Sequence, residues 1–237
     1  MSIYQYILQS ISNGQKLLAI LLDPDKVNLE EVSQLIQNIN NKADFIFVGG
    51  STVSKGDTEK LVHQIKKRTK IPILLFPGDY TQLTNEADAL LFLSLISGEN
   101  PEYLIKQQLK SVPFLQKSKL EIIPTGYILI NGGTKTSVQK VSDTTPIDRN
   151  NIDLISNTAL AGMYMGKKLI YLEAGSGAKT PVSTDIIKAI KNKLTIPLIV
   201  GGGIRTRKQL DNAFNSGADL VVIGTAYEEN NQLFDDF

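Results

Sequence analysis

The hydrophobic positions of this chain gather in eight short runs of aliphatic and β-branched residues, separated by longer segments that mix polar and apolar positions. Continuous apolar runs are typical of strands buried on both faces, as in parallel sheets. The runs occupy residues 17–22, 45–48, 71–76, 89–94, 125–130, 168–172, 196–200 and 218–223. Such alternation predicts an α/β fold, a closed (β/α)8 TIM barrel, in one domain over residues 1–237.

Helical segments are predicted from apolar spacing and capping residues. Helices are expected at residues 3–11, 57–69, 101–116 and 151–165, and helix starts at Asn28, Ser183, Thr206 and Thr225. The connection over residues 131–150 is polar and without periodicity. A structureless connection of that length is usually functional, so it predicts a loop over the barrel mouth.

Glycines end the last two strands. The seventh strand runs into Gly201, Gly202 and Gly203, and the eighth into Gly224 and Thr225. Glycines let backbone N–H groups approach a ligand closely, and the helix N-termini that follow attract anions. In a (β/α)8 barrel a phosphate site usually lies in these loops. We predict phosphate binding here, with a tight turn at the glycines and a helix cap at Thr225 as structural alternatives.

Two aspartates, Asp23 and Asp25, follow the first strand. Asn28 has capping-box spacing to a glutamate, so neither aspartate is needed to cap the next helix. A carboxylate at the end of a barrel strand is typical of catalysis or metal binding. Ser51 follows the second strand, and one carboxylate plus one hydroxyl suits Mg²⁺, which takes its other oxygens from water and substrate phosphates. The structural alternative is an Asx turn at the aspartates.

Glu173 lies at the end of the sixth strand, where a carboxylate, a hydroxyl and two glycines crowd together. The segment reads Tyr171-Leu172-Glu173-Ala174-Gly175-Ser176-Gly177. A purely structural glutamate is rarely placed there, which favours a general base or an anchor for a substrate hydroxyl.

Aromatic residues gather on one flank of the predicted mouth. They are Phe76, Tyr80, Phe92 and Tyr103. Most such residues belong to the core of an average protein. A substrate with a long hydrocarbon tail would lie along this flank.

Composition excludes several classes of protein. The net charge of +1, without an arginine-rich stripe, gives no field for nucleic acid. The absence of cysteine excludes disulfides and thiolate metal sites. His63, the only histidine, falls off the apolar stripe of its helix, so we expect it on the surface and exclude paired-histidine metal sites. No apolar run is long enough to span a membrane and the start lacks a signal peptide, so a cytoplasmic location is expected.

Six motifs stand at strand ends in a characteristic order. They are Asp23-Pro24-Asp25-Lys26, Gly49-Gly50-Ser51, Gly126-Tyr127, the segment 171–177, Gly201-Gly202-Gly203-Ile204 and Gly224-Thr225. In this order the chain resembles the geranylgeranylglyceryl phosphate synthase family, which includes the PcrB-type enzymes. The resemblance spans nearly the whole chain, and its most specific part is the Tyr-Leu-Glu-Ala-Gly-Ser-Gly segment.

The resemblance implies a Mg²⁺-dependent prenyltransferase that joins a polyprenyl diphosphate to the primary hydroxyl of sn-glycerol 1-phosphate. By position, Asp23 and Ser51 would hold Mg²⁺, and Glu173 would accept the hydroxyl proton. Tyr127 would line the route between the two substrates. The glycerol phosphate would contact Tyr171, Leu172, Glu173, Ala174, Gly175, Ser176, Gly177, Gly201, Gly202, Gly203, Gly224 and Thr225. Family members form dimers or larger rings, so a homo-oligomer, a dimer or hexamer, with transient contact to a membrane surface is expected.

The length of the prenyl tail is also implied by position. Tyr103 falls where the family sets tail length, and a bulky residue there favours geranylgeranyl diphosphate over longer donors. Two features depart from the family pattern. Leu21 stands where some bacterial members have a basic residue, and the connection 131–150 is longer and more polar than in the short PcrB type.

A sugar-phosphate isomerase or aldolase on the same barrel is the alternative function. It would need a cysteine, paired histidines, or a Schiff-base lysine at the carboxyl end of a strand. Lys167 and Lys168 begin the sixth strand and so lie at the opposite end of the barrel. The prenyltransferase is therefore the favoured hypothesis.

Overall fold

Eight parallel strands close into a barrel in chain order, with β8 pairing with β1. The computed structural model describes residues 1–224 and 227. The strands are β1 Leu17–Leu22, β2 Phe45–Val48, β3 Ile73–Leu75, β4 Ala89–Leu95, β5 Glu121–Leu129, β6 Leu169–Glu173, β7 Leu198–Gly201 and β8 Leu220–Ile223. The predicted (β/α)8 barrel is confirmed.

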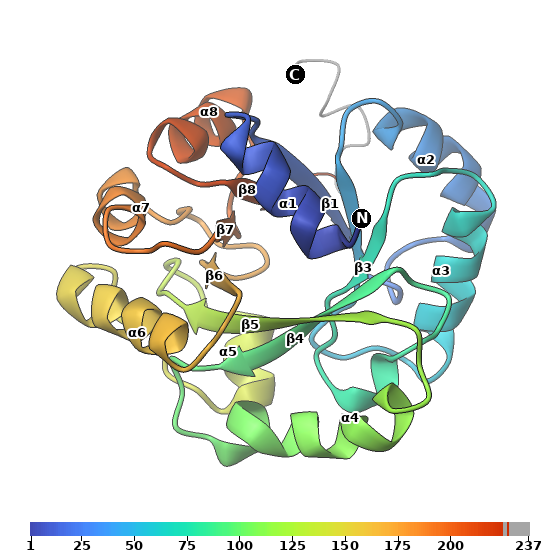
Figure 1. Cartoon of the computed structure of the whole chain (residues 1–237), viewed down its shortest axis with the longest axis horizontal. Helices are drawn as coiled ribbons and strands as arrows, with labels where there is room; N and C mark the ends of the chain where they lie inside the picture. The colour runs from blue at the N-terminus through green and yellow to red at the C-terminus, as the bar shows by residue number, and fades with distance from the viewer. Residues whose placement is uncertain (225–226, 228–237) are drawn as a thin grey trace.

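Helices surround the barrel as a ring, apart from the first helix, which lies across one end of it (Figure 1). They are α1 Ile3–Ser12, α2 Val32–Ile39, α3 Asp57–Lys66, α4 Gln107–Leu115, α5 Ser137–Ser142, α6 Ile152–Tyr164, α7 Thr184–Lys191 and α8 Arg207–Asn215, with short turns η1 Leu29–Glu31, η2 Tyr80–Gln82 and η3 Glu102–Lys106. In the described part of the chain, no helix combines the length and the apolar character that crossing a membrane requires.

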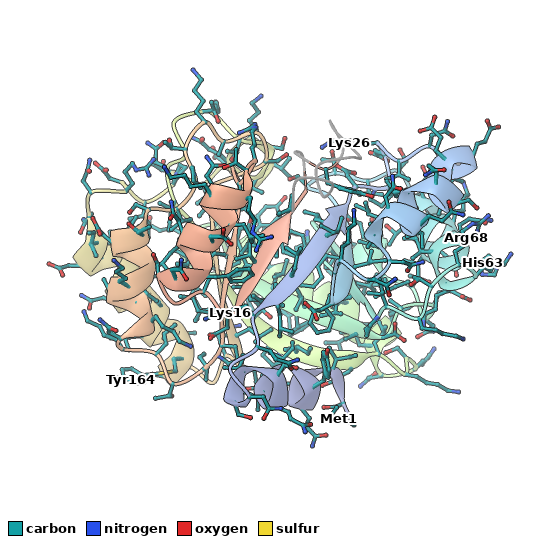
Figure 2. All side chains as sticks on the ribbon, turned by 90° about the horizontal axis from the view of Figure 1, so that it is seen from above. Met1, Lys16, Lys26, His63, Arg68 and Tyr164 are labelled. Atoms are coloured by element: carbon teal, nitrogen blue, oxygen red, sulfur yellow. The ribbon has the colours of Figure 1, made fainter. Side chains whose placement is uncertain are left out.

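The predicted helix starts at Ser183 and Thr206 are confirmed, since each side chain accepts a backbone N–H of its helix. Asn28 also caps, but the helix that it starts is the short turn η1, which leads into α2. The cap predicted at Thr225 lies outside the described residues. His63 is half-exposed and projects from α3 at the periphery of the molecule (Figure 2), as expected.

Side chains along each strand alternate between two apolar layers, because successive residues point to opposite faces. One layer, which includes Ile20 and Leu172, packs between the strands and the helices. The other, which includes Phe47 and Tyr171, fills the inside of the barrel. The alternation therefore turns Tyr171 and Glu173 inward and Leu172 outward.

One end of the barrel is closed by α1. Met1 and Lys16 mark this end in Figure 2, and Lys26, just after β1, marks the other. The Glu121 carboxylate accepts hydrogen bonds from the N–H groups of Ile3 and Tyr4, the latter at 3.0 Å, and so fixes the first turn of α1. A ligand site must therefore be built at the opposite end, where the strands finish.

Two segments differ from their predictions. The single helix expected over residues 101–116 begins as a π-helical turn, η3, before α4. The connection expected to be a structureless loop, residues 131–150, contains α5 and a bridge between Ile130 and Ile147. The helix was missed because six residues are too few for a visible apolar period.

Candidate active site

The carboxyl ends of the strands surround one cavity of about 390 Å³. Most of the predicted site residues line it: Asp23, Ser51, Tyr103, Tyr127, Tyr171, Glu173, Ser176, Gly177, Gly202, Gly203 and Gly224. Leu172, Ala174, Gly175 and Gly201 are not part of its wall, and Leu172 packs on the helix side of β6. Thr225 lies outside the described residues.

Glu173 is the buried carboxyl group of this cavity. Burial raises its pKa to about 7, because a charge is poorly solvated there. The Gly175 N–H donates to Oε1 at 2.6 Å, and this bond, together with the neighbouring Tyr171 hydroxyl, holds the pKa from rising further. A carboxyl group with a pKa near neutrality can accept a proton at physiological pH and release it again.

The Tyr171 hydroxyl is buried beside this carboxylate and has no well-formed hydrogen bond to any described residue. The Tyr171 ring lies 5.3 Å from the Tyr127 ring and 5.2 Å from the Phe76 ring, centroid to centroid. Phe76 and Tyr127 are 5.9 Å apart, so the three rings form an aromatic triangle at the floor of the mouth. A buried hydroxyl without a partner is costly, and a polar ligand would satisfy it.

The glycine loop that follows β7 lies against Glu173. Gly202 has a φ of +84°, and a Cβ added there would lie 2.2 Å from Glu173 Oε1. Only glycine combines that backbone conformation with so close an approach. Among the residues described, the N–H groups of Gly177, Gly202 and Gly203 have no hydrogen-bond partner. These free N–H groups line the cavity and can donate hydrogen bonds to phosphate oxygens.

Arg205 adds a cation that was not among the site residues predicted from the sequence. Its guanidinium donates to the carbonyl of Ala178 at 2.7 Å, and the residue lines the cavity beside the glycine loop. Guanidinium groups bind phosphate well. The signal was present in the sequence, since Arg205 directly follows the Gly201-Gly202-Gly203-Ile204 motif.

Asp23, just after β1, lies against Gly50 at the end of β2. A Cβ at Gly50 would lie 2.7 Å from Asp23 Oδ1, so glycine is needed for this approach. Burial raises the pKa of the Asp23 carboxyl, whereas the Asp25 N–H, at 3.2 Å, and Lys26 lower it. The Asp25 bond is the Asx turn considered as the structural alternative; it occupies Oδ1, and Oδ2 forms an ion pair with Lys26 Nζ at 3.6 Å.

Asp25 was expected to be spare, but its carboxylate accepts the N–H of Ser54 at 2.9 Å and braces the connection after β2. Ser51 lines the same cavity as Asp23. No group of three histidine, cysteine, aspartate or glutamate side chains gathers into a metal cluster in the part that the structure describes. A metal here would therefore be coordinated by few protein ligands.

The remaining flank of the cavity is largely apolar. Phe92, Tyr103 and Val138 line it, with Val141 and Tyr80 toward the outside. The Tyr103 hydroxyl donates to the carbonyl of Val141 at 3.1 Å, so η3 and α5 are joined across this flank. The predicted aromatic flank is therefore present, and α5 completes it.

A closed parallel barrel with a cavity at the carboxyl ends of its strands defines a protein of the (β/α)8-barrel class. Comparison with known families makes the assignment narrower. The model of the PcrB family matches residues 12–237, and this chain belongs to that family.

Relatives and a solved structure agree with the family. The chain is 53% identical to geranylgeranylglyceryl phosphate synthase of Flavobacterium johnsoniae, over 99% of this chain and 97% of that protein. It is 54% identical to the protein of the same name from Zunongwangia profunda, over 94% of this chain and 95% of that protein. It is also similar to (S)-3-O-geranylgeranylglyceryl phosphate synthase from Thermoplasma acidophilum, solved in complex with sn-glycerol-1-phosphate. The TM-score is 0.93, with 31% identity, covering 100% of this chain and 95% of that one.

Proposed function

We propose that this chain transfers a polyprenyl group from its diphosphate to the primary hydroxyl of sn-glycerol 1-phosphate. The bond between the allylic carbon and the diphosphate oxygen breaks, an ether bond forms, and diphosphate leaves. The hydroxyl proton passes to Glu173. The observation that carries the proposal is this buried carboxylate, with a pKa of about 7, beside a cup of free backbone N–H groups.

The glycine cup and Arg205 would bind the phosphate of sn-glycerol 1-phosphate. Gly177, Gly202 and Gly203 offer N–H donors, and the Arg205 guanidinium supplies charge. The Tyr171 hydroxyl, buried beside Glu173 and without a well-formed hydrogen bond to any described residue, would bond a glycerol oxygen. The attacking hydroxyl would then face the Glu173 oxygen that does not accept the Gly175 N–H.

A Mg²⁺ ion fits the residues at the Asp23 end. Asp23 is partly buried, has only Oδ1 engaged by backbone, and shares the cavity with Ser51. Mg²⁺ is commonly held by one or two carboxylates together with water and substrate phosphates, so a three-residue cluster is not required. When bound there, the ion would neutralise charge on the leaving diphosphate.

The apolar flank would take the prenyl tail, with the geranylgeranyl group favoured. Phe92 and Val138 offer hydrocarbon contacts, and the aromatic triangle lies between this flank and Glu173. Tyr127, whose ring packs on both Phe76 and Tyr171, would separate the allylic carbon from water. Tyr103 narrows the flank by its bond to Val141, which supports a role in limiting tail length.

The test is product formation from purified protein with Mg²⁺ and geranylgeranyl diphosphate, using sn-glycerol 1-phosphate or its mirror image, sn-glycerol 3-phosphate. We expect ether lipid and diphosphate in equal amounts with the first acceptor, and little product with the second. EDTA should abolish turnover. Turnover of sugar phosphates, with no lipid from any prenyl donor, would instead favour the isomerase or aldolase alternative.

A further inference from the structure

The turn that carries Tyr103 departs from α-helical geometry where it meets the cavity. In η3 the N–H of Gln107 bonds the carbonyl of Glu102, five residues earlier, which is the π-helical pattern. A π turn shifts the helical register, so nearby carbonyls lose their regular helical donors. The turn therefore depends on partners from outside its own five residues.

Two buried polar side chains supply these partners. Ser94 Oγ donates to the carbonyl of Leu104 at 2.7 Å. The Gln108 amide nitrogen donates to the carbonyl of Leu93 in a short bond, and more weakly, at 3.5 Å, to that of Tyr103. Ser94 is 5% exposed and Gln108 is 8% exposed, so none of these three bonds competes with bulk water. Together they tie the turn to β4.

The Gln108 side chain is used only as a donor. Its Oε1 atom is buried and has no hydrogen-bond partner in the described parts of the chain. Leaving that oxygen unsatisfied has a cost, which the two donor bonds to backbone must offset. The donor bonds therefore fix the Gln108 side chain between the turn η3 and the strand β4.

We propose that Ser94 and Gln108 are positioning residues that set the length of the prenyl donor by holding Tyr103 in place. The inference rests on the proposed prenyl transfer. The Tyr103 ring stands in the apolar flank because its turn is fixed from behind by Ser94 and its hydroxyl is bonded to Val141 in front. Loss of the rear bonds lets the turn, and the ring with it, move aside for a longer tail.

Ser94 gives the cleaner variant, because it is not part of the cavity wall in the described residues, whereas Gln108 is. Ser94→Ala cannot change contacts with a tail directly and can act only through the turn. Gln108→Met removes the amide donors at similar length. Ser94→Thr keeps a hydroxyl and is the conservative rescue. Gln116→Met makes the same exchange at an exposed position just past α4 and is the matched control.

The measurement is kcat/KM for geranylgeranyl diphosphate and for geranylfarnesyl diphosphate, which is one isoprene unit longer. In Ser94→Ala and Gln108→Met the ratio of the longer to the shorter donor should rise about three- to tenfold, the worth of one buried hydrogen bond. The change should come mainly from a lower KM for the longer donor. Ser94→Thr and Gln116→Met should keep the wild-type ratio. In Tyr103→Ala the ratio of the longer to the shorter donor should rise more than in Ser94→Ala or Gln108→Met.

A purely structural role predicts something different. It would lower the thermal midpoint and the rate with both donors alike, without changing their ratio. That result in both Ser94→Ala and Gln108→Met overturns the inference. A wild-type protein that makes no lipid with any donor overturns the proposed function itself, so the two failures are distinct.

Discussion

Replacing Glu173 with glutamine should remove catalysis and strengthen the fold at the same time. Above neutral pH the native protein must keep a charge in apolar surroundings. The pKa of Glu173 stands at about 7 against an ordinary value of 4.5, which corresponds to about 3 kcal/mol of lost stability when the group is ionised. Glutamine has nearly the same shape and carries no charge, and its amide oxygen can still accept the Gly175 N–H.

The sign of this change in stability with pH follows from proton binding. Because the folded-state pKa is raised, the native protein holds the proton that the unfolded chain releases as pH rises from 4.5 to about 7. Wild-type stability therefore falls over that interval, and the variant is spared the loss. We expect Glu173→Gln to gain about 2 to 3 kcal/mol near pH 8 and almost nothing near pH 4.

Urea unfolding followed by circular dichroism, at several pH values, measures this difference. Glu59→Gln, which removes an exposed carboxylate in α3, is the control and should show no comparable gain. Activity of Glu173→Gln should fall by about 10² to 10⁴. Wild-type kcat/KM should decline below about pH 7 as the base is protonated. A stability difference that does not change with pH would refute the buried ionised carboxylate.

Two further substitutions test the two ends of the cavity. Gly202→Ala adds a Cβ 2.2 Å from Glu173 Oε1 at a φ of +84°, so KM for sn-glycerol 1-phosphate should rise by about tenfold or more. Gly14→Ala has a similar φ of +75° but meets open space, and steady-state kinetics should find its KM unchanged. Asp23→Asn should raise the Mg²⁺ concentration for half-maximal activity by at least about tenfold. Glycerol phosphate binding, measured by calorimetry, should stay the same, and equal Mg²⁺ requirements in Asp23→Asn and wild type would exclude the proposed ligand.

The positions of the strands could be predicted because parallel strands buried on both faces consist of continuous apolar residues. β1 and β2 have the bounds expected from sequence, since each run ends sharply in a polar or glycine residue. β5 begins four residues earlier than expected, at Glu121, because its first part is only partly buried and contains Pro124. A run that is exposed at one end carries a weaker signal.

Part of the cavity wall could be predicted from residue types at strand ends. What the sequence could not give were contacts across the barrel, such as the approach of Gly50 to Asp23 and of Gly202 to Glu173. The hydrogen bond that the Ser54 N–H donates to the Asp25 carboxylate joins two connections that are distant in the chain, so local capping rules could not find it. The π-helical turn η3 accepts a hydrogen bond from Ser94, which stands in another element. Each miss is a tertiary interaction that overrides a local preference.

The aromatic triangle has an optical consequence. The chain has no tryptophan and eight tyrosines, so phenol rings dominate its near-ultraviolet absorption and emission. Tyr127 and Tyr171 are buried with their ring centroids 5.3 Å apart, a distance at which their electronic transitions couple. Any molecule that settles against them changes that coupling. Near-ultraviolet circular dichroism of the unlabelled protein can thus report how much of the cavity is occupied by ligand, without dye, radioisotope or turnover.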